Sequence, residues 1–226
     1  MNQATIEKEV RRLQFEIWTH AGQIFSAGIP PLPRLFEPEV AARICDYRYE
    51  SRPSLGRLPF GNDALYETAG LIDHEQRIIL VSDQFAYETQ RFTGAHEIGH
   101  LMLHPGLRLH RDRPLTGAHP RQRHVFESEA DYFAACFLAP AKLVRTEFEK
   151  RFGPPPKALT DTMAFHLKGN SMAELLNARP GSLDFAAALA SADKYDRRRF
   201  HPLASTFGMS VHAMAIRLDE LGLAVY

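Results

Sequence analysis

Cysteine, net charge and long apolar runs are all scarce in this sequence. Its 226 residues include two cysteines, Cys45 and Cys136, too few for a disulfide framework or a four-cysteine zinc site. Lysine plus arginine and aspartate plus glutamate each total 27, so global charge favours neither nucleic acid nor an anionic membrane. No apolar run approaches the roughly 18 residues that span a bilayer. The charged N-terminal stretch MNQATIEKEVRRLQFEIW also lacks the apolar segment of a signal peptide. These absences predict a cytoplasmic protein with no membrane partner.

The apolar spacing predicts helices arranged around a short β-hairpin. Helices are expected over residues 4–25, 83–104, 125–140 and 141–152, and hairpin strands over 70–72 and 77–81. Ser82 or Asp83 is the expected N-cap of the second helix. Residues 35–64 stay ambiguous, and the arginine-rich residues 105–124 are expected to form a loop. The stretch FGPPPKALT suggests a linker. We therefore expect an α+β domain over residues 1–152 and a helical extension over residues 153–226.

The stretch TGAHEIGHLMLH carries the pattern H-E-x-x-H. On a helix, His96 and His100 lie on one face, about 6 Å apart along the axis, and their imidazoles can converge on one ion. Glu97 projects about 100° away, where it can reach a water bound to that ion but not the ion itself. The competing interpretation is a surface helix that happens to carry two histidines. A third ligand elsewhere would favour the metal site.

The helix over VFESEADYFAACFLAP offers two candidates for that ligand, Glu127 and Glu129. On a helical wheel, Ala134 and Leu138 each fall within about 20° of Glu127, whereas Glu129 falls on the outer side of the helix. Glu127 therefore shares the packing face and is the predicted ligand, and Glu129 is predicted to be solvated. Asp131 lies one turn along on the same face as Glu127, and it is predicted to accept the outer N–H of a ligating histidine.

Two further residues of the metal-binding stretch need an explanation. His104 continues the face of His96 and His100, but it lies about 12 Å from His96 along the axis, too far to share one ion. We expect it to contact free carbonyls at the helix end. Gly99 is expected to admit another chain segment close to the site, because glycine inside a helix otherwise costs about 0.5–1 kcal/mol relative to alanine.

RFTGAHEIGHLMLH followed by ESEADYFAACFLAP resembles the ImmA/IrrE family of zinc metallopeptidases, a branch of the gluzincins. The likeness is strong over about residues 66–140. It implies a zincin-like domain with a small twisted sheet, in which His96, His100 and Glu127 bind Zn²⁺ and Glu97 is the catalytic base. It also implies that the substrate is a protein, such as a helix-turn-helix repressor of stress-response or mobile-element genes. In three places this chain departs from the family pattern: Gly94, Asp131 and Ala139.

The resemblance also implies where a substrate binds. In zincin-like folds the strand before the metal-binding helix lies at the sheet edge above the cleft. An extended peptide would then add to residues 77–82 through backbone hydrogen bonds. Tyr132 is not expected to stabilise the oxyanion, because its position on the helical wheel points it away from Glu127.

Two other classes of function remain open. The stretch LASTFGMSVHAMAIRLDELGL spaces its small and apolar residues as a helix-turn-helix does, which with the arginine-rich loop suggests a DNA-binding regulator. The balanced charge and the acidic LDEL argue against it. Alternatively, the chain keeps a zinc site but acts as a partner-binding regulator that needs activation.

Overall fold

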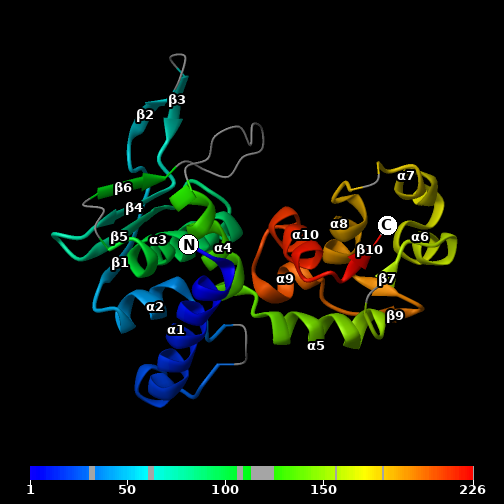
Figure 1. Cartoon of the computed structure of the whole chain (residues 1–226), viewed down its shortest axis with the longest axis horizontal. Coiled ribbons are helices and arrows are strands. Elements are labelled where there is room, and N and C mark those ends of the chain that lie inside the picture. The colour runs from blue at the N-terminus through cyan, green and yellow to red at the C-terminus, as the bar shows by residue number, and fades with distance from the viewer. Residues whose placement is uncertain are drawn as a thin grey trace. The chain divides into compact units, whose positions relative to one another are not determined.

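A computed structural model describes residues 1–30, 34–60, 64–105, 109–112, 125–155, 157–179 and 181–225. Contacts divide the chain into two compact units, Met1–Leu138 and Ala139–Tyr226. The division precedes α5 (Ala141–Phe152), whereas the sequence suggested a boundary at the end of that helix (Figure 1). Within the described residues, no helix is both long enough and apolar enough to cross a membrane.

A four-stranded mixed sheet forms the frame of the first unit. Its order is β1 (Arg48–Arg52), β5 (Ile78–Ser82), β4 (Gly70–Asp73) and β6 (Leu109–Asp112). β1 runs parallel to β5, and β4 runs antiparallel to both β5 and β6. The hairpin β4–β5 is the one predicted from the sequence, and the apolar run of β5 is buried on both faces as expected.

The sheet corrects two expectations. β5 is an inner strand, not the edge strand, because β1 pairs along its whole length from Arg48 opposite Ile78 to Arg52 opposite Ser82. β6 lies in the segment that was expected to be a loop, of which residues 106–108 and 113–124 lie outside the described residues. A separate hairpin, β2 (Arg57–Phe60) with β3 (Ala64–Glu67), comes from the ambiguous region.

Helix α3 (Tyr87–Leu103), which carries the two histidines of the H-E-x-x-H pattern, begins later than predicted. Neither Ser82 nor Asp83 is its N-cap: Ser82 is the last residue of β5, and the Asp83 amide donates to the Arg52 carbonyl. Ala86 occupies the cap position and makes no side-chain cap hydrogen bond. Backbone pairing with the sheet therefore continues through the residues that were expected to start the helix.

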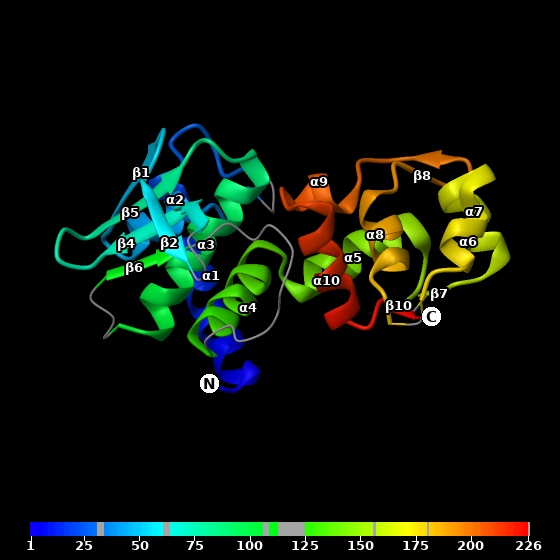
Figure 2. The ribbon, with the colours of Figure 1, turned by 90° about the horizontal axis from the view of Figure 1, so that it is seen from above.

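Helix α4 (Val125–Leu138) packs between α3 and α1 (Gln3–Ile24) (Figures 1 and 2). On one side, an alanine Cβ at Gly99 of α3 would lie 3.0 Å from the Ala130 Cα atom. On the other side, the Tyr132 hydroxyl donates to Glu7, and the Gln14 amide donates to the Phe137 carbonyl. The short helix α2 (Pro38–Ile44) also contacts α1 and α3. α4 is thus enclosed by helices on two sides.

The second unit consists of short helices and two-residue strands. After α5 come β7 (Lys157–Ala158), α6 (Asp161–Lys168), η1 (Gly169–Ser171), α7 (Met172–Leu176), α8 (Asp184–Ser191), β8 (Lys194–Tyr195), β9 (Arg198–Arg199), α9 (Leu203–Phe207), α10 (Val211–Glu220) and β10 (Ala224–Val225). β7 pairs with β10 and β8 pairs with β9. The unit is mainly helical, as expected for the extension.

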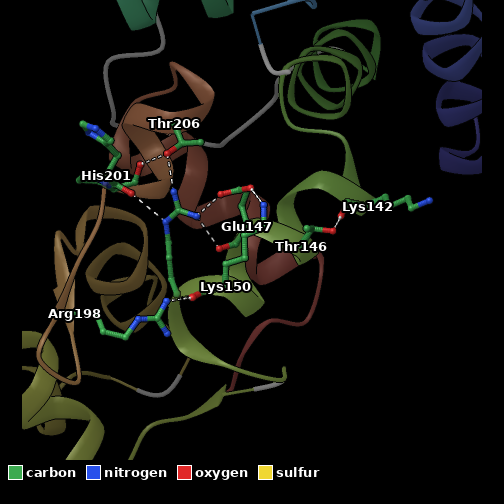
Figure 3. Close-up of polar contacts among 9 residues, drawn as sticks. Lys142, Thr146, Glu147, Lys150, Arg198, His201 and Thr206 are labelled. Carbon is green, nitrogen blue, oxygen red and sulfur yellow. Dashed lines mark hydrogen bonds and ion pairs between the residues drawn. The ribbon is translucent and has the colours of Figure 1, made fainter. Parts of the chain in front are cut away.

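Arg151 explains why α5 belongs to the second unit. Its buried guanidinium donates to the His201 carbonyl, the Thr206 hydroxyl and the Glu147 carboxylate. The labelled partners in Figure 3 converge on this point from α5, from α9 and from the segment before α9. His201 and Thr206 follow Arg151 by some 50 residues in the sequence. Their hydrogen bonds to Arg151 therefore hold α5 against the segment around α9, in the second unit.

Candidate metal centre

Three side chains from two helices converge in the first unit. His96 and His100 project from α3, and Glu127 projects from the first turn of α4. The two histidine Nε2 atoms lie 2.9 Å apart, and the Glu127 carboxylate oxygens lie 3.5 Å from His96 Nε2 and 3.7 Å from His100 Nε2. Ligands at about 2.0–2.1 Å from a tetrahedral ion are about 3.3 Å apart, so these separations suit zinc.

The hydrogen bond made by His96 on the side away from His100 shows which of its ring nitrogens is available to a metal. The Nδ1 atom of His96 lies 2.9 Å from the Asp131 carboxylate. Because an ionised carboxylate can only accept, Nδ1 carries the proton and Nε2 presents a lone pair toward His100 and Glu127. Three electron-pair donors this close together could hold a cation at their centre.

The two helices can approach because their contact residues are small. Gly99 lies one residue before His100, and a Cβ there would lie 3.0 Å from Ala130 Cα and 3.1 Å from the Ala130 carbonyl oxygen. The expectation that Gly99 admits another chain segment is confirmed. Gly94, a departure from the family pattern, is covered by the Tyr49 hydroxyl from β1, which occupies the space of a larger residue.

Glu97 lies between the metal-binding helix and the sheet. It is fully buried, and it packs against Gly70 of β4, where a Cβ would lie 2.5 Å from Glu97 Oε1. Gly70 pairs with Val81 of β5 on one side and with Asp112 of β6 on the other, so the Glu97 carboxylate packs against an inner strand of the sheet. The three candidate ligands differ in burial. The histidines are buried, whereas the Glu127 side chain is 23% exposed.

Glu129 is not solvated, contrary to the expectation from its helical wheel. It is 7% exposed, and its carboxylate lies 2.8 Å from His104 Nε2. The wheel described α4 by itself and could not include His104, which reaches it from the end of α3. His104 likewise does not use its side chain on helix-end carbonyls: its Nδ1 lies 3.1 Å from His100 Nδ1.

Tyr132 lies away from the three candidate ligands. Its hydroxyl donates to Glu7 of α1 at 2.9 Å, as its position on the far side of α4 suggested. Burial raises the pKa of this phenol, with the nearby Cys136 and Glu7 acting in the same direction. The hydroxyl therefore stays protonated and is engaged with α1 rather than with the metal centre.

Comparison with known proteins agrees with this geometry. Residues 57–154 match the model of a family described as "IrrE N-terminal-like domain". The proteins named radiation response metalloprotease IrrE from Deinococcus deserti and Deinococcus radiodurans are 37% and 36% identical over 97 residues. That stretch covers 41% of this chain but 32% and 28% of the two relatives, so the match spans about a third of their length. Over residues 57–154 the chain is therefore similar to the IrrE N-terminal-like domain and to two proteins named as metalloproteases.

Proposed function

We propose that this protein is a zinc-dependent endopeptidase, and that its substrate is a helix-turn-helix repressor of stress-response or mobile-element genes. The observation that carries the proposal is the convergence of His96, His100 and Glu127, with the buried Glu97 next to His96 in the chain. The radiation-response role in the names of the two relatives supports a stress-response circuit.

Each side chain has one task in this proposal. His96, His100 and Glu127 hold the ion, and Asp131 keeps the His96 ring in the tautomer that offers Nε2. When bound there, Zn²⁺ supplies Lewis-acid chemistry, which polarises a peptide carbonyl and lowers the pKa of water to about 7. Glu97 takes the proton from the attacking water and delivers it to the leaving amine.

The substrate strand would add to β6. β5 is paired on both sides, so it cannot accept a peptide. Within the described residues β6 pairs with β4 alone, and its Asp112 lies opposite Gly70, the residue that contacts Glu97. An extended peptide hydrogen-bonded to the outer side of β6 would lie two strand spacings, about 9–10 Å, from β4, the strand against which the base packs.

Incubation with a repressor encoded beside the gene tests the proposal. Mass spectrometry should find cleavage with zinc and none after the metal is removed by a chelator. Glu97→Gln should bind zinc as the wild type does and lower the cleavage rate by about 10²–10⁴-fold, the usual contribution of a general base. Glu88→Gln, at the start of the same helix, is the matched control and should cleave normally. Full activity of Glu97→Gln would refute the role of Glu97.

Two other outcomes would point to the alternative functions. Stoichiometric zinc binding without cleavage of any repressor would favour a regulator that needs a partner or signal. DNA binding that weakens steeply with salt would favour a DNA-binding regulator. The helices α9 and α10 give that second function little support, because Arg217, the sole lysine or arginine in either helix, is buried. The exposed positions of α10 are Val211, His212, Ile216, Asp219 and Glu220.

A further inference from the structure

His100 has a two-residue network on its outer side. Its Nδ1 lies 3.1 Å from His104 Nδ1, and His104 Nε2 lies 2.8 Å from the Glu129 carboxylate. All three residues are buried, at 1%, 8% and 7% exposure. Two buried polar residues thus extend from one imidazole, on the side that faces away from the candidate metal centre. The Glu129 carboxylate also forms an ion pair with the N-terminal amino group of Met1 through its other oxygen.

With Glu129 ionised and His104 neutral, the network determines where the protons lie. The Glu129 carboxylate can only accept, so His104 Nε2 carries a proton and donates it. In neutral His104 the Nδ1 atom is then a lone pair, which accepts from His100 Nδ1. His100 therefore holds its proton on Nδ1 and presents the Nε2 lone pair to His96 and Glu127. Glu129 does for His100, through His104, what Asp131 does directly for His96.

We propose that His104 and Glu129 are positioning residues that hold His100 in the tautomer and ring orientation needed to bind a metal. The inference rests on the proposed function only in taking His100 as a metal ligand. His104 also contacts the Phe126 ring, with centroids 4.6 Å apart, so a role in packing alone is the competing explanation. The two explanations differ in what a substitution does to His100 itself.

The tautomer of His100 can be measured in the metal-free protein. Nitrogen-15 NMR of the wild type should show the His100 proton on Nδ1. In His104→Phe, which keeps an aromatic ring against Phe126 but has no acceptor, His100 should become a mixture of the two tautomers. A wild-type His100 with its proton on Nε2, or an unchanged Nδ1 tautomer in His104→Phe, would overturn the inference.

Zinc affinity provides the second readout, measured by competition with a chelator. Removing the hydrogen-bond partner of a metal-bound histidine weakens metal binding by about 10–100-fold. We expect a loss of this size in His104→Phe and in Glu129→Leu. His104→Gln should recover most of the affinity, because its amide can accept from His100 and donate to Glu129. Equal affinity in the Phe and Gln variants would mean that the hydrogen bonds do not matter.

Two further variants separate this effect from general destabilisation. Phe92→Leu shortens a buried side chain earlier in α3 and should lower the unfolding temperature with little change in zinc affinity. Glu129→Gln keeps an oxygen that accepts from His104, so it should stay within about threefold of the wild type if Glu129→Leu does not fold. Neither the tautomer nor the affinity depends on peptidase activity, so an inactive protein that passes both tests would contradict the proposed function alone.

Discussion

Gly70 places the carboxylate of Glu97 by having no side chain of its own. A Cβ at this position would lie 2.5 Å from both Glu97 Oε1 and Thr93 Cγ2, distances at which one of the groups must move. We expect Gly70→Ala to displace the carboxylate without disturbing the three candidate metal ligands. The cleavage rate should fall at least about tenfold, since small displacements of a catalytic group are costly. Zinc affinity should stay within about threefold, which a chelator competition would check, and full activity would show that Glu97 tolerates the shift.

The Cys45 thiol is predicted to react slowly with alkylating reagents. Burial raises the pKa of its thiol to about 11, with Glu16 acting in the same direction and Arg12 against it. The thiolate is the reactive form, so at pH 8 only about a thousandth of the residue can react. Alkylation followed by mass spectrometry should label Cys45 far more slowly than a free cysteine and should accelerate as pH rises toward 11. Rapid labelling at pH 8 would contradict the burial.

The sequence predicted the positions of some residues of the candidate metal centre, and the structure was needed to place the others. Glu127 and Asp131 could be assigned because a helical repeat assigns side chains to faces without any knowledge of the partner. Glu129 and His104 were misjudged because each is buried by a helix other than its own. A hydrogen bond between the end of α3 and the start of α4 leaves no periodic signal in the sequence.

At the scale of elements, the α3–α4 contact sets the geometry of the centre. Gly99→Ala would place a methyl group 3.0 Å from Ala130 Cα and 3.1 Å from its carbonyl oxygen, and backbone cannot rotate away. We expect the helices to separate, at a cost of about 1–3 kcal/mol in the free energy of unfolding, with weaker zinc binding. Chemical denaturation and chelator competition would measure the two effects.

Gly22→Ala is the matched control for that substitution. It also lies in a helix, α1, but a Cβ there would meet nothing within 4 Å. It should stabilise the protein by about 0.5–1 kcal/mol and leave zinc affinity unchanged. Similar behaviour of the two alanine variants would mean that the tight contact at Gly99 is not maintained in solution.

The helices were easier to predict than the sheet. α1 and α5 each bury one stripe of regularly spaced residues, α4 is apolar and buried all round from Phe133 to Leu138, and the hairpin β4–β5 has its turn between two short apolar runs. β1 has the sequence RYESR and β6 the sequence LHRD, neither of which has the apolar run of a buried strand. Each becomes a strand because a neighbouring strand supplies hydrogen-bond partners, which is non-local information.

At the scale of the whole chain, the two units should respond separately to substitution. Arg151→Met removes the guanidinium that joins Glu147, His201 and Thr206, and it should destabilise the second unit by about 2–4 kcal/mol. Zinc affinity should not change, because every candidate ligand lies in the first unit. Calorimetry with and without zinc would separate the two effects, and a loss of zinc affinity would show that the units are coupled.

Arg145→Met is the matched control for the arginine substitution. Arg145 also lies on α5, but its hydrogen bond to the Leu221 carbonyl is exposed. Its loss should cost less than about 1 kcal/mol. A cost as large as that of Arg151→Met would mean that burial is not what makes the Arg151 contacts strong.

Because the candidate ligands come from separate helices, a bound ion would also act as a cross-link. It would tie His100 to Glu127 and close the chain between them into a loop, as a disulfide does. Cross-links that close loops of this size restrict the unfolded chain by the equivalent of about 3 kcal/mol. Zinc should therefore raise the melting temperature, and the rise should grow with the logarithm of the free zinc concentration above the dissociation constant. Zinc depletion would then remove both the proposed activity and this stabilising cross-link.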